Sequence, residues 1–146
     1  MDDALELGHV HLKVRDVDRS VEFYRDALGL AVTERAGRFA FLSGGEKHHE
    51  VALQELGPDA SDPGRGVGLY HAAFEVATPE ALAATDRRLR ERGVAVTPVD
   101  HGISEALYFD DPDGNGLEVY LDTRAERDRE AWRGRNEPFD PESLGE

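Results

Sequence analysis

The stretch Tyr108–Tyr120, YFDDPDGNGLEVY, decides the fold because it combines a strand, a tight turn and a second strand. Pro112 presets the backbone φ of the turn, and Gly114 supplies its left-handed position. After the turn, residues 117–121 alternate between apolar and polar side chains, as in a half-buried strand. Glu118 therefore lies within an apolar strand, where a carboxylate is costly to bury unless a positive partner such as a metal ion meets it.

Outward from this stretch, the chain shows one order of elements twice. The first half predicts a strand at 7–14, a helix that ends near Leu28, and strands at 30–33, 39–42 and 49–56. The second half predicts a strand at 69–76, a helix from Thr78 to Gly93, and strands at 94–99, 106–109 and 116–121. The repeat implies one structural unit used twice.

The expected fold class is therefore α+β. Two βαβββ modules, residues 5–56 and 69–122, form an eight-stranded cup-shaped sheet with flanking helices within one domain, residues 1–122. Residues 57–68, rich in Gly, Pro and Asp, read as the linker between the modules. Residues 123–146 form a mostly charged C-terminal tail, with a short helix predicted near 125–132.

Composition excludes several classes of partner and chemistry. The formal net charge is −14, with 31 acidic against 17 basic residues, which argues against nucleic acid or an anionic membrane as partner. The chain has no cysteine, so disulfides, thiolate zinc sites and cysteine nucleophiles are excluded. There is no run of about 18 apolar residues, and the opening Met1-Asp2-Asp3 is acidic, so we expect a cytoplasmic protein.

The repeat also predicts a metal site. His9 and His71 fall at equivalent places in the two modules. Two modules related by an internal twofold would bring their first strands together, so that His9, His71 and Glu118 face one cavity. Two histidines and one carboxylate with open positions suit Fe(II), and also Mn(II).

Two further residues, His11 and Glu50, are candidate alternative or additional metal ligands, so the ligand set stays open. His11 shares a strand face with His9 and is an alternative ligand. Glu50-Val51-Ala52-Leu53 can be aligned with Glu118-Val119-Tyr120-Leu121, which makes Glu50 a candidate fourth ligand. Because neighbours on a strand face opposite sides, His49 and Glu50 cannot both point inward without a bulge.

The segments 8–30, 69–76 and 111–120 together resemble the vicinal oxygen chelate superfamily, which includes glyoxalase I, methylmalonyl-CoA epimerase, bleomycin-binding proteins and extradiol dioxygenases. The resemblance covers about residues 7–122. Three further features resemble the extradiol branch, particularly small catechol 2,3-dioxygenase-like proteins. These are His49 within HHEVAL, His101 within DHGIS, and Tyr108 ten residues before Glu118.

This resemblance implies an Fe(II)-dependent dioxygenase that cleaves a catechol-type aromatic substrate with O₂. It implies His49 as acid/base, and Tyr108 and His101 as hydrogen-bond partners of the substrate oxygens. Imidazole suits acid/base work near neutral pH because its unperturbed pKa is about 6.5. Small members of the family with exposed sheet edges often pair, so a homodimer is one expectation.

Other members of the superfamily provide the alternatives. If Glu50 points inward, the site has four ligands, and the lyase or isomerase chemistry of the glyoxalase and epimerase branch is favoured. Bleomycin-binding proteins use the cavity as a ligand trap without the metal triad. Fosfomycin-resistance enzymes use the same triad to add a thiol to an epoxide.

Overall fold

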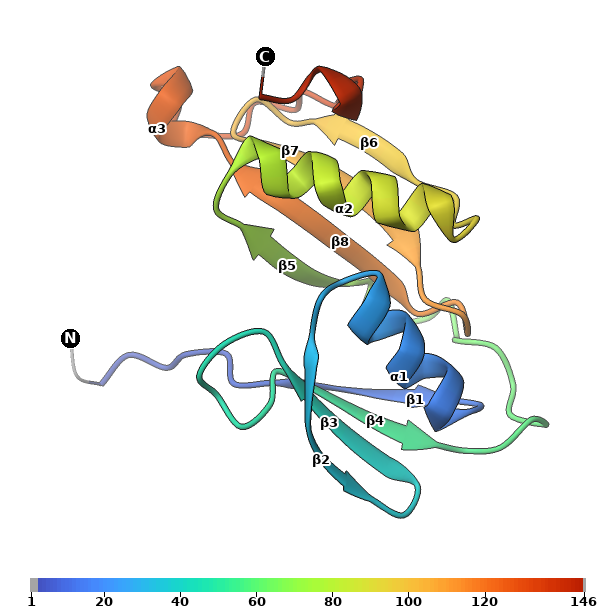
Figure 1. Cartoon of the computed structure of the whole chain (residues 1–146). Helices are drawn as coiled ribbons and strands as arrows, with labels where there is room; N and C mark the ends of the chain where they lie inside the picture. Colours follow the sequence, from blue (N-terminus) through green and yellow to red (C-terminus); the bar gives the residue numbers. More distant parts are fainter. Residues whose placement is uncertain (1–2, 146) are drawn as a thin grey trace. The chain divides into compact units, whose positions relative to one another are not determined.

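The computed structural model describes residues 3–145 (Figure 1). Met1 and Asp2 of the acidic opening, and Glu146 at the other end, lie outside the described residues. The chain divides into two compact units, Met1–Pro63 and Gly64–Glu146. The division falls within residues 57–68, and the C-terminal residues belong to the second unit.

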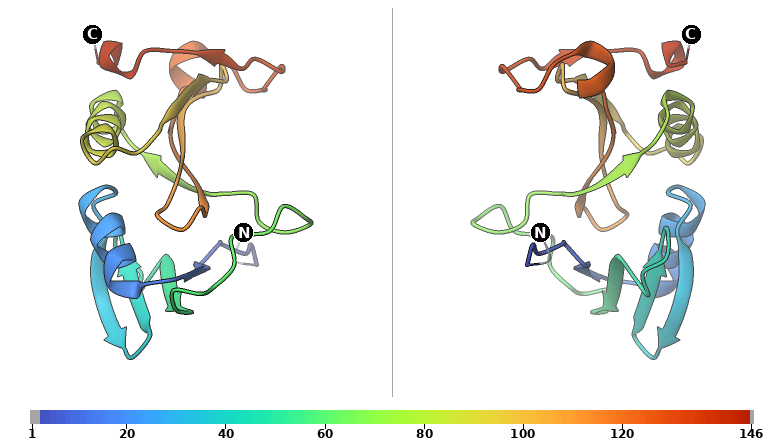
Figure 2. Two further views of the ribbon diagram at one scale, coloured as in Figure 1. Left: turned by 90° about the vertical axis from the view of Figure 1, so that its right-hand side faces the viewer. Right: turned by 90° about the vertical axis from the view of Figure 1, so that its left-hand side faces the viewer.

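The first unit is a four-stranded sheet covered on one face by a helix (Figures 1 and 2). Its strand order is β1-β4-β3-β2, with β1 parallel to β4 and the other neighbours antiparallel. Asp16 caps the helix by accepting hydrogen bonds from the backbone N–H groups of Asp18 and Arg19. The elements are β1 Val10–Val14, α1 Val17–Asp26, β2 Ala31–Ala36, β3 Phe39–Ser43 and β4 Val51–Glu55.

The second unit repeats this arrangement and adds one strand. Its sheet has the order β5-β8-β7-β6-β9, again with the first strand parallel to its neighbour. Helix α2 starts at a Thr78 cap followed by a proline, and Leu82 and Leu89 on its inner face are fully buried. The elements are β5 Ala72–Val76, α2 Pro79–Glu91, β6 Thr97–Asp100, β7 Ser104–Asp110, β8 Gly116–Asp122, α3 Arg124–Arg127, β9 Glu137–Pro138 and the 3₁₀ turn η1 Pro141–Ser143.

The turn between β7 and β8 forms as the sequence predicts. Asp111 Oδ1 accepts hydrogen bonds of 2.9 Å from the backbone N–H groups of both Asp113 and Asn115. Gly114 has a φ of +90°, the left-handed position of the turn. The turn therefore fixes how β7 and β8 pair, and with them the positions of Tyr108 and Glu118.

The sheet architecture differs from the expectation in two respects. The eight expected strands appear in order, but they form two separate hydrogen-bonded sheets of four and five strands, and the single eight-stranded cup is not confirmed. The fifth strand of the second sheet is β9, which pairs with β6. The C-terminal segment thus covers a sheet edge that would otherwise present unpaired backbone groups.

Several elements are shorter than the sequence patterns suggest. Strands β1 and β5 begin three residues later than expected, because the parallel ladders start at Val10 and Ala72. His9 and His71 consequently lie immediately before their strands. The tail helix is the single turn α3 and ends at Arg127, because Asp128 adopts a left-handed φ of +52°.

The strand register relates the two units residue by residue. His11 lies two residues after His9 and pairs with Ala52, whereas the matching Ala73 pairs with Glu118. With His9 aligned on His71, the counterpart of Glu118 in the first unit is therefore Ala52. The antiparallel neighbours agree, since Ala52 pairs on its other side with Phe41 and Glu118 pairs with Tyr108.

The expected alignment of Glu50 with Glu118 is therefore wrong by two residues. It followed the shared letters Glu-Val-x-Leu, whereas the position on a strand is set by its hydrogen-bonded partners. Glu50 precedes β4 and corresponds to Gly116, so the first unit offers no carboxylate at the position that Glu118 occupies in the second.

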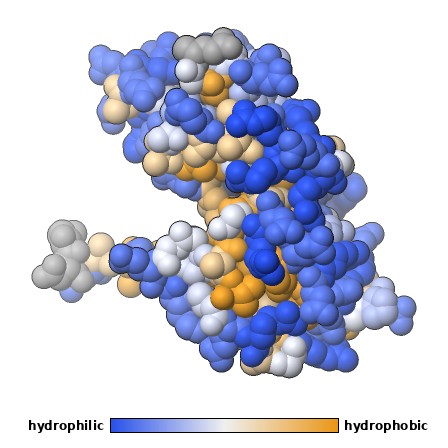
Figure 3. All heavy atoms as spheres, in the orientation of Figure 1, coloured by the Kyte–Doolittle hydropathy of each residue, from blue (hydrophilic) through white to orange (hydrophobic). Residues whose placement is uncertain are grey.

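Hydrophilic residues cover most of the face that Figure 3 shows. Among the described residues, every helix is too short or too polar to cross a membrane.

Candidate active site

His71 and Glu118 lie together in the second unit. The β5–β8 register places Ala73 beside Glu118, and His71 lies two residues before Ala73 on the same strand face. The distance from His71 Nε2 to Glu118 Oε1 is 3.0 Å. Glu118 is only 8% exposed, so this carboxylate needs the positive partner that its place in the sequence suggested.

Tyr108 lies across from Glu118 in the antiparallel β7–β8 pair. Its ring centroid is 5.7 Å from that of His71, and its hydroxyl oxygen is 2.7 Å from His101 Nε2. Burial and the neighbouring Glu118 raise the pKa of Tyr108 to about 12. The phenol is therefore a hydrogen-bond donor at neutral pH.

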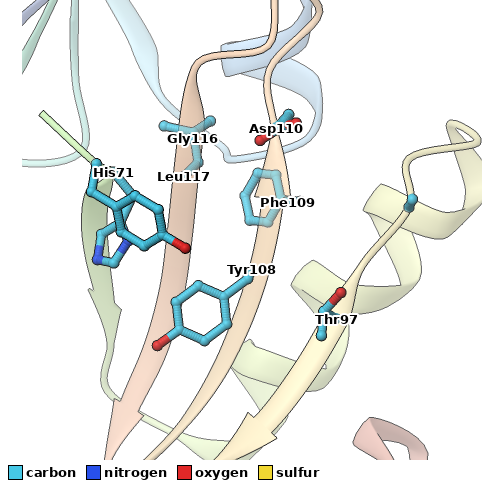
Figure 4. A pocket seen from close by; sticks show the side chains of 9 residues that line it. His71, Thr97, Tyr108, Phe109, Asp110, Gly116 and Leu117 are labelled. Atoms are coloured by element: carbon cyan, nitrogen blue, oxygen red, sulfur yellow. The ribbon is translucent and has the colours of Figure 1, made fainter. Parts of the chain in front are cut away.

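A pocket of about 350 Å³ opens beside these residues (Figure 4). His71 borders it from just before β5, Tyr108 from β7 and Thr97 from β6. Burial and the adjacent Asp111 raise the pKa of Asp110, the carboxylate at the pocket. The lining residues are Tyr70, His71, Ala95, Thr97, Tyr108, Phe109, Asp110, Gly116 and Leu117.

His101 sits on the turn between β6 and β7. Its backbone N–H donates to the Ser104 carbonyl over 2.9 Å, and Gly102 has a φ of +83° that lets the chain reverse there. The turn directs His101 Nε2 to the Tyr108 hydroxyl. The sequence placed both residues in the site, and the structure brings these two together.

In the first unit, His9 lies beside His49. Their ring centroids are 4.6 Å apart, and the His49 ring also contacts Phe41 at 4.9 Å. His48 Nδ1 is 2.9 Å from His49 Nδ1, and His48 Nε2 is 3.0 Å from Glu34 Oε1. Burial, then the neighbouring His9 and His48, lower the pKa of His49. His49 is therefore neutral near pH 7, as a base must be.

The two alternative ligands have other partners. His11 Nε2 is 2.9 Å from Gln54 Oε1. Glu50 Oε1 accepts hydrogen bonds from Ser43 Oγ at 2.8 Å and from the Gly44 N–H at 3.2 Å, so it fastens the loop before β4. Both residues therefore form hydrogen bonds within the first unit.

His71 and Glu118 are donors of the kind that a divalent metal accepts. Within either unit, the described residues hold no group of three or more His, Asp or Glu side chains that could hold a metal. His71 and Glu118 supply a nitrogen and a buried carboxylate oxygen within contact distance. The expected triad takes its third ligand, His9, from the other unit, and that assignment stays a prediction.

Sequence reasoning missed several residues of the second unit. Tyr70, Thr97 and Asp110 line the pocket, and Asn136 contacts His101. Tyr70 directly precedes the candidate ligand His71, and this position in the sequence could have identified it as a residue near the site. Asn136 lies in a charged tail without periodicity, and only the tertiary structure reveals it.

Comparison with known proteins places this chain in a family. The sequence matches the Glyoxalase/Bleomycin resistance protein/Dioxygenase superfamily over residues 6–119. A solved glyoxylase/bleomycin resistance protein/dioxygenase domain from Frankia sp. EAN1pec superposes with a TM-score of 0.69 at 28% identity, covering 82% of this chain and 99% of that one. The chain belongs to this superfamily, the vicinal oxygen chelate proteins.

Similar proteins within the family carry several names. A catechol-2,3-dioxygenase of Bacillus subtilis (strain 168) is 38% identical over 87% of this chain, which spans only 44% of that protein's length. Biphenyl-2,3-diol 1,2-dioxygenase 3 of Rhodococcus globerulus is 32% identical over 95% of this chain and 75% of its own length. A probable lactoylglutathione lyase of Synechocystis sp. is 33% identical over 84% of this chain and 98% of its own length.

Proposed function

We propose that this protein is a metal-dependent extradiol dioxygenase that cleaves a catechol-type substrate with O₂. The observation that carries the proposal is the hydrogen bond of 2.7 Å between Tyr108 and His101, beside the His71–Glu118 pair. A tyrosine and a histidine next to two candidate metal ligands suit a substrate with two adjacent hydroxyl groups. Similarity to dioxygenases at 38% and 32% identity supports the same reaction.

The proposed metal ligands are His9, His71 and Glu118. When bound, Fe(II), or alternatively Mn(II), supplies the Lewis acidity and redox chemistry of the reaction at its open positions. The protein's own groups orient the catechol and move its protons. Tyr108 and His101 are the proposed partners of the substrate oxygens, and His49, neutral near pH 7, is the proposed acid/base.

The runner-up is a lyase or isomerase of the glyoxalase type, which the similarity to the lactoylglutathione lyase supports. The lyase or isomerase assignment requires Glu50 as a fourth metal ligand. Ala52 stands at the position equivalent to Glu118, and Glu50 is hydrogen-bonded to the loop before β4. These observations support the three-ligand dioxygenase over the four-ligand isomerase.

The pocket supports an uncharged catechol as substrate. Among the described residues that line it there is no lysine or arginine, and Asp110 contributes a negative charge. Phe109 and Leu117 add apolar surface. A carboxylated catechol would find no counter-ion there, whereas an alkyl- or aryl-substituted catechol would bury apolar surface.

The decisive experiment loads the protein anaerobically with Fe(II) and follows oxygen uptake with a panel of catechols. Extradiol cleavage consumes one O₂ per catechol and gives a coloured ring-cleaved product. The matched control is Glu118→Ala, which should bind no metal and consume no oxygen. A loaded protein that consumes no oxygen with any catechol, but isomerises a glutathione hemithioacetal, would transfer the assignment to the glyoxalase branch.

A further inference from the structure

The turn that carries His101 is held from outside the sheet by the C-terminal segment, residues 123–138. Thr123 Oγ1 donates to the Gly102 carbonyl over 3.0 Å, and Arg127 Nη1 donates to Asp100 Oδ1 over 2.8 Å. Asp100, which precedes His101, is 8% exposed. This segment begins after residue 119, where the match to the superfamily model ends.

The same segment presents two oxygen acceptors to His101. His101 Nδ1 is 2.7 Å from Asn136 Oδ1 and 3.3 Å from the Arg135 carbonyl oxygen. Trp132 Nε1 donates to the same Arg135 carbonyl over 3.0 Å and holds it in place. Because a backbone carbonyl can only accept, Nδ1 is the nitrogen that carries hydrogen. A neutral imidazole has one N–H, so Nε2 carries the lone pair.

This tautomer determines the direction of the Tyr108 hydroxyl. His101 Nε2 can only accept from it, so Tyr108 donates over the 2.7 Å contact. The hydroxyl has one proton and two neighbouring acceptors, since Glu118 lies across the β7–β8 pair. Committing that proton to His101 leaves Glu118 with its contact to His71 Nε2, 3.0 Å away.

We propose that Asn136 is a positioning residue that fixes His101 in its Nδ1–H form, and that the C-terminal segment thereby directs the Tyr108 proton toward His101 and away from Glu118. The segment acts through two hydrogen bonds in series, Asn136 to His101 and His101 to Tyr108.

The consequence for catalysis rests on the proposed function. A substrate hydroxyl beside Tyr108 passes its proton to the Tyr108 oxygen while the original Tyr108 proton passes to His101 Nε2. One O–H bond breaks at the substrate and one forms at Tyr108; the original Tyr108 O–H breaks and an N–H forms at His101. The imidazolium then donates through Nδ1–H to Asn136 and the Arg135 carbonyl, which stabilise its charge.

Nitrogen NMR of the full chain, free of paramagnetic metal, tests the geometry without any reaction. In the wild type, the His101 signals, assigned by their loss in His101→Gln, should show a pyrrole-type Nδ1 and a pyridine-type Nε2. Asn136→Leu removes the nearer acceptor at similar size and leaves only the Arg135 carbonyl oxygen, whose 3.3 Å contact is long for an N–H···O bond, so it should give a mixture of tautomers. Asn136→Asp keeps an acceptor at this position and should retain hydrogen on Nδ1. A pure Nδ1–H form in Asn136→Leu would overturn the proposal.

Kinetics test the consequence with the Fe(II)-loaded protein and catechol. Asn136→Leu should lower kcat about ten-fold, the effect of one hydrogen bond, with KM little changed, and Asn136→Asp should restore most of it. Ser143→Ala is the control, because it removes a hydrogen bond to the Asp140 carbonyl in the residues that follow the segment, away from His101. If the protein cleaves no catechol at all, the proposed function fails while the NMR result still decides the role of Asn136.

Discussion

Gly116 lies so close to the carbonyl oxygen of Tyr70 that a Cβ atom at this position would approach it to 2.6 Å. The next closest atom is the Cβ of His71, at 3.5 Å. Because the clash is with backbone, no side-chain rotation can relieve it. The close approach of β8 to the residues before β5 therefore determines where His71 lies relative to Glu118.

We expect Gly116→Ala to displace His71 and weaken metal binding by about 10- to 100-fold, the usual effect of disturbing a ligand's support. Calorimetric titration with Mn(II) measures the affinity. Gly66→Ala is the matched control, because a Cβ at Gly66 meets nothing within 4 Å. Equal Mn(II) affinity in Gly116→Ala and wild type would show that this contact does not position a ligand.

Glu118→Ala and Glu50→Ala should separate the two ligand assignments. Glu118→Ala should leave the protein unable to hold metal after dialysis, measured by elemental analysis. Glu50→Ala should keep its metal but lose about 1–3 kcal/mol of stability, because Ser43 and Gly44 lose the acceptor that fastens their loop. Loss of metal from Glu50→Ala at unchanged stability would favour the four-ligand isomerase.

The order of elements could be predicted because each depends on local signals. Asp111 to Gly114 form the expected turn, and the helices begin at the caps beside Asp16 and Thr78. The structure pairs Tyr108 with Glu118 across this turn, since a short turn fixes the pairing of the two strands. Periodicity and turn chemistry were sufficient for this part of the fold.

The remaining features depend on non-local contacts. The position equivalent to Glu118 is Ala52 rather than Glu50, and only the pairing of β1 with β4 reveals this. Asn136 contacts His101 from 35 residues away, in a tail whose sequence shows no period. Such contacts depend on how segments distant in the sequence pack against each other, and a local sequence pattern does not encode this packing.

His49→Ala should keep the metal yet lower turnover by about 10²- to 10⁴-fold, the usual contribution of a positioned acid/base. His11→Ala is the matched control, because His11 is hydrogen-bonded to Gln54 and should leave both metal and turnover near wild-type values. Metal content and oxygen uptake are measured on the same preparations. A loss of metal in His11→Ala would make His11, rather than His9, the ligand of the first unit.

Asp100 should make the stability of the second unit dependent on pH at the acid end. Burial opposes ionisation, but hydrogen bonds from Arg127 and Gly102 outweigh it and lower the pKa of Asp100 below its ordinary value of 3.8. A carboxylate with a depressed folded-state pKa adds stability that is complete above its unfolded pKa and is lost as pH falls through the folded value. Thermal unfolding followed from pH 7 downward should therefore show a loss near and below pH 3.8 that is smaller in Asp100→Asn. Parallel curves for the two proteins would contradict this role.

The charge of the pocket should select among substrates. Asp110 repels an anionic substituent, so kcat/KM should be about ten-fold higher for an uncharged alkylcatechol than for a carboxylated catechol of similar size. Asp110→Asn should reduce this preference by improving the carboxylated substrate, and added salt should do the same in the wild type. Glu142→Gln is the control, because it removes an exposed acid of the same unit that is not among the pocket-lining residues. A preference that Asp110→Asn leaves unchanged would assign the selectivity to the apolar walls formed by Phe109 and Leu117.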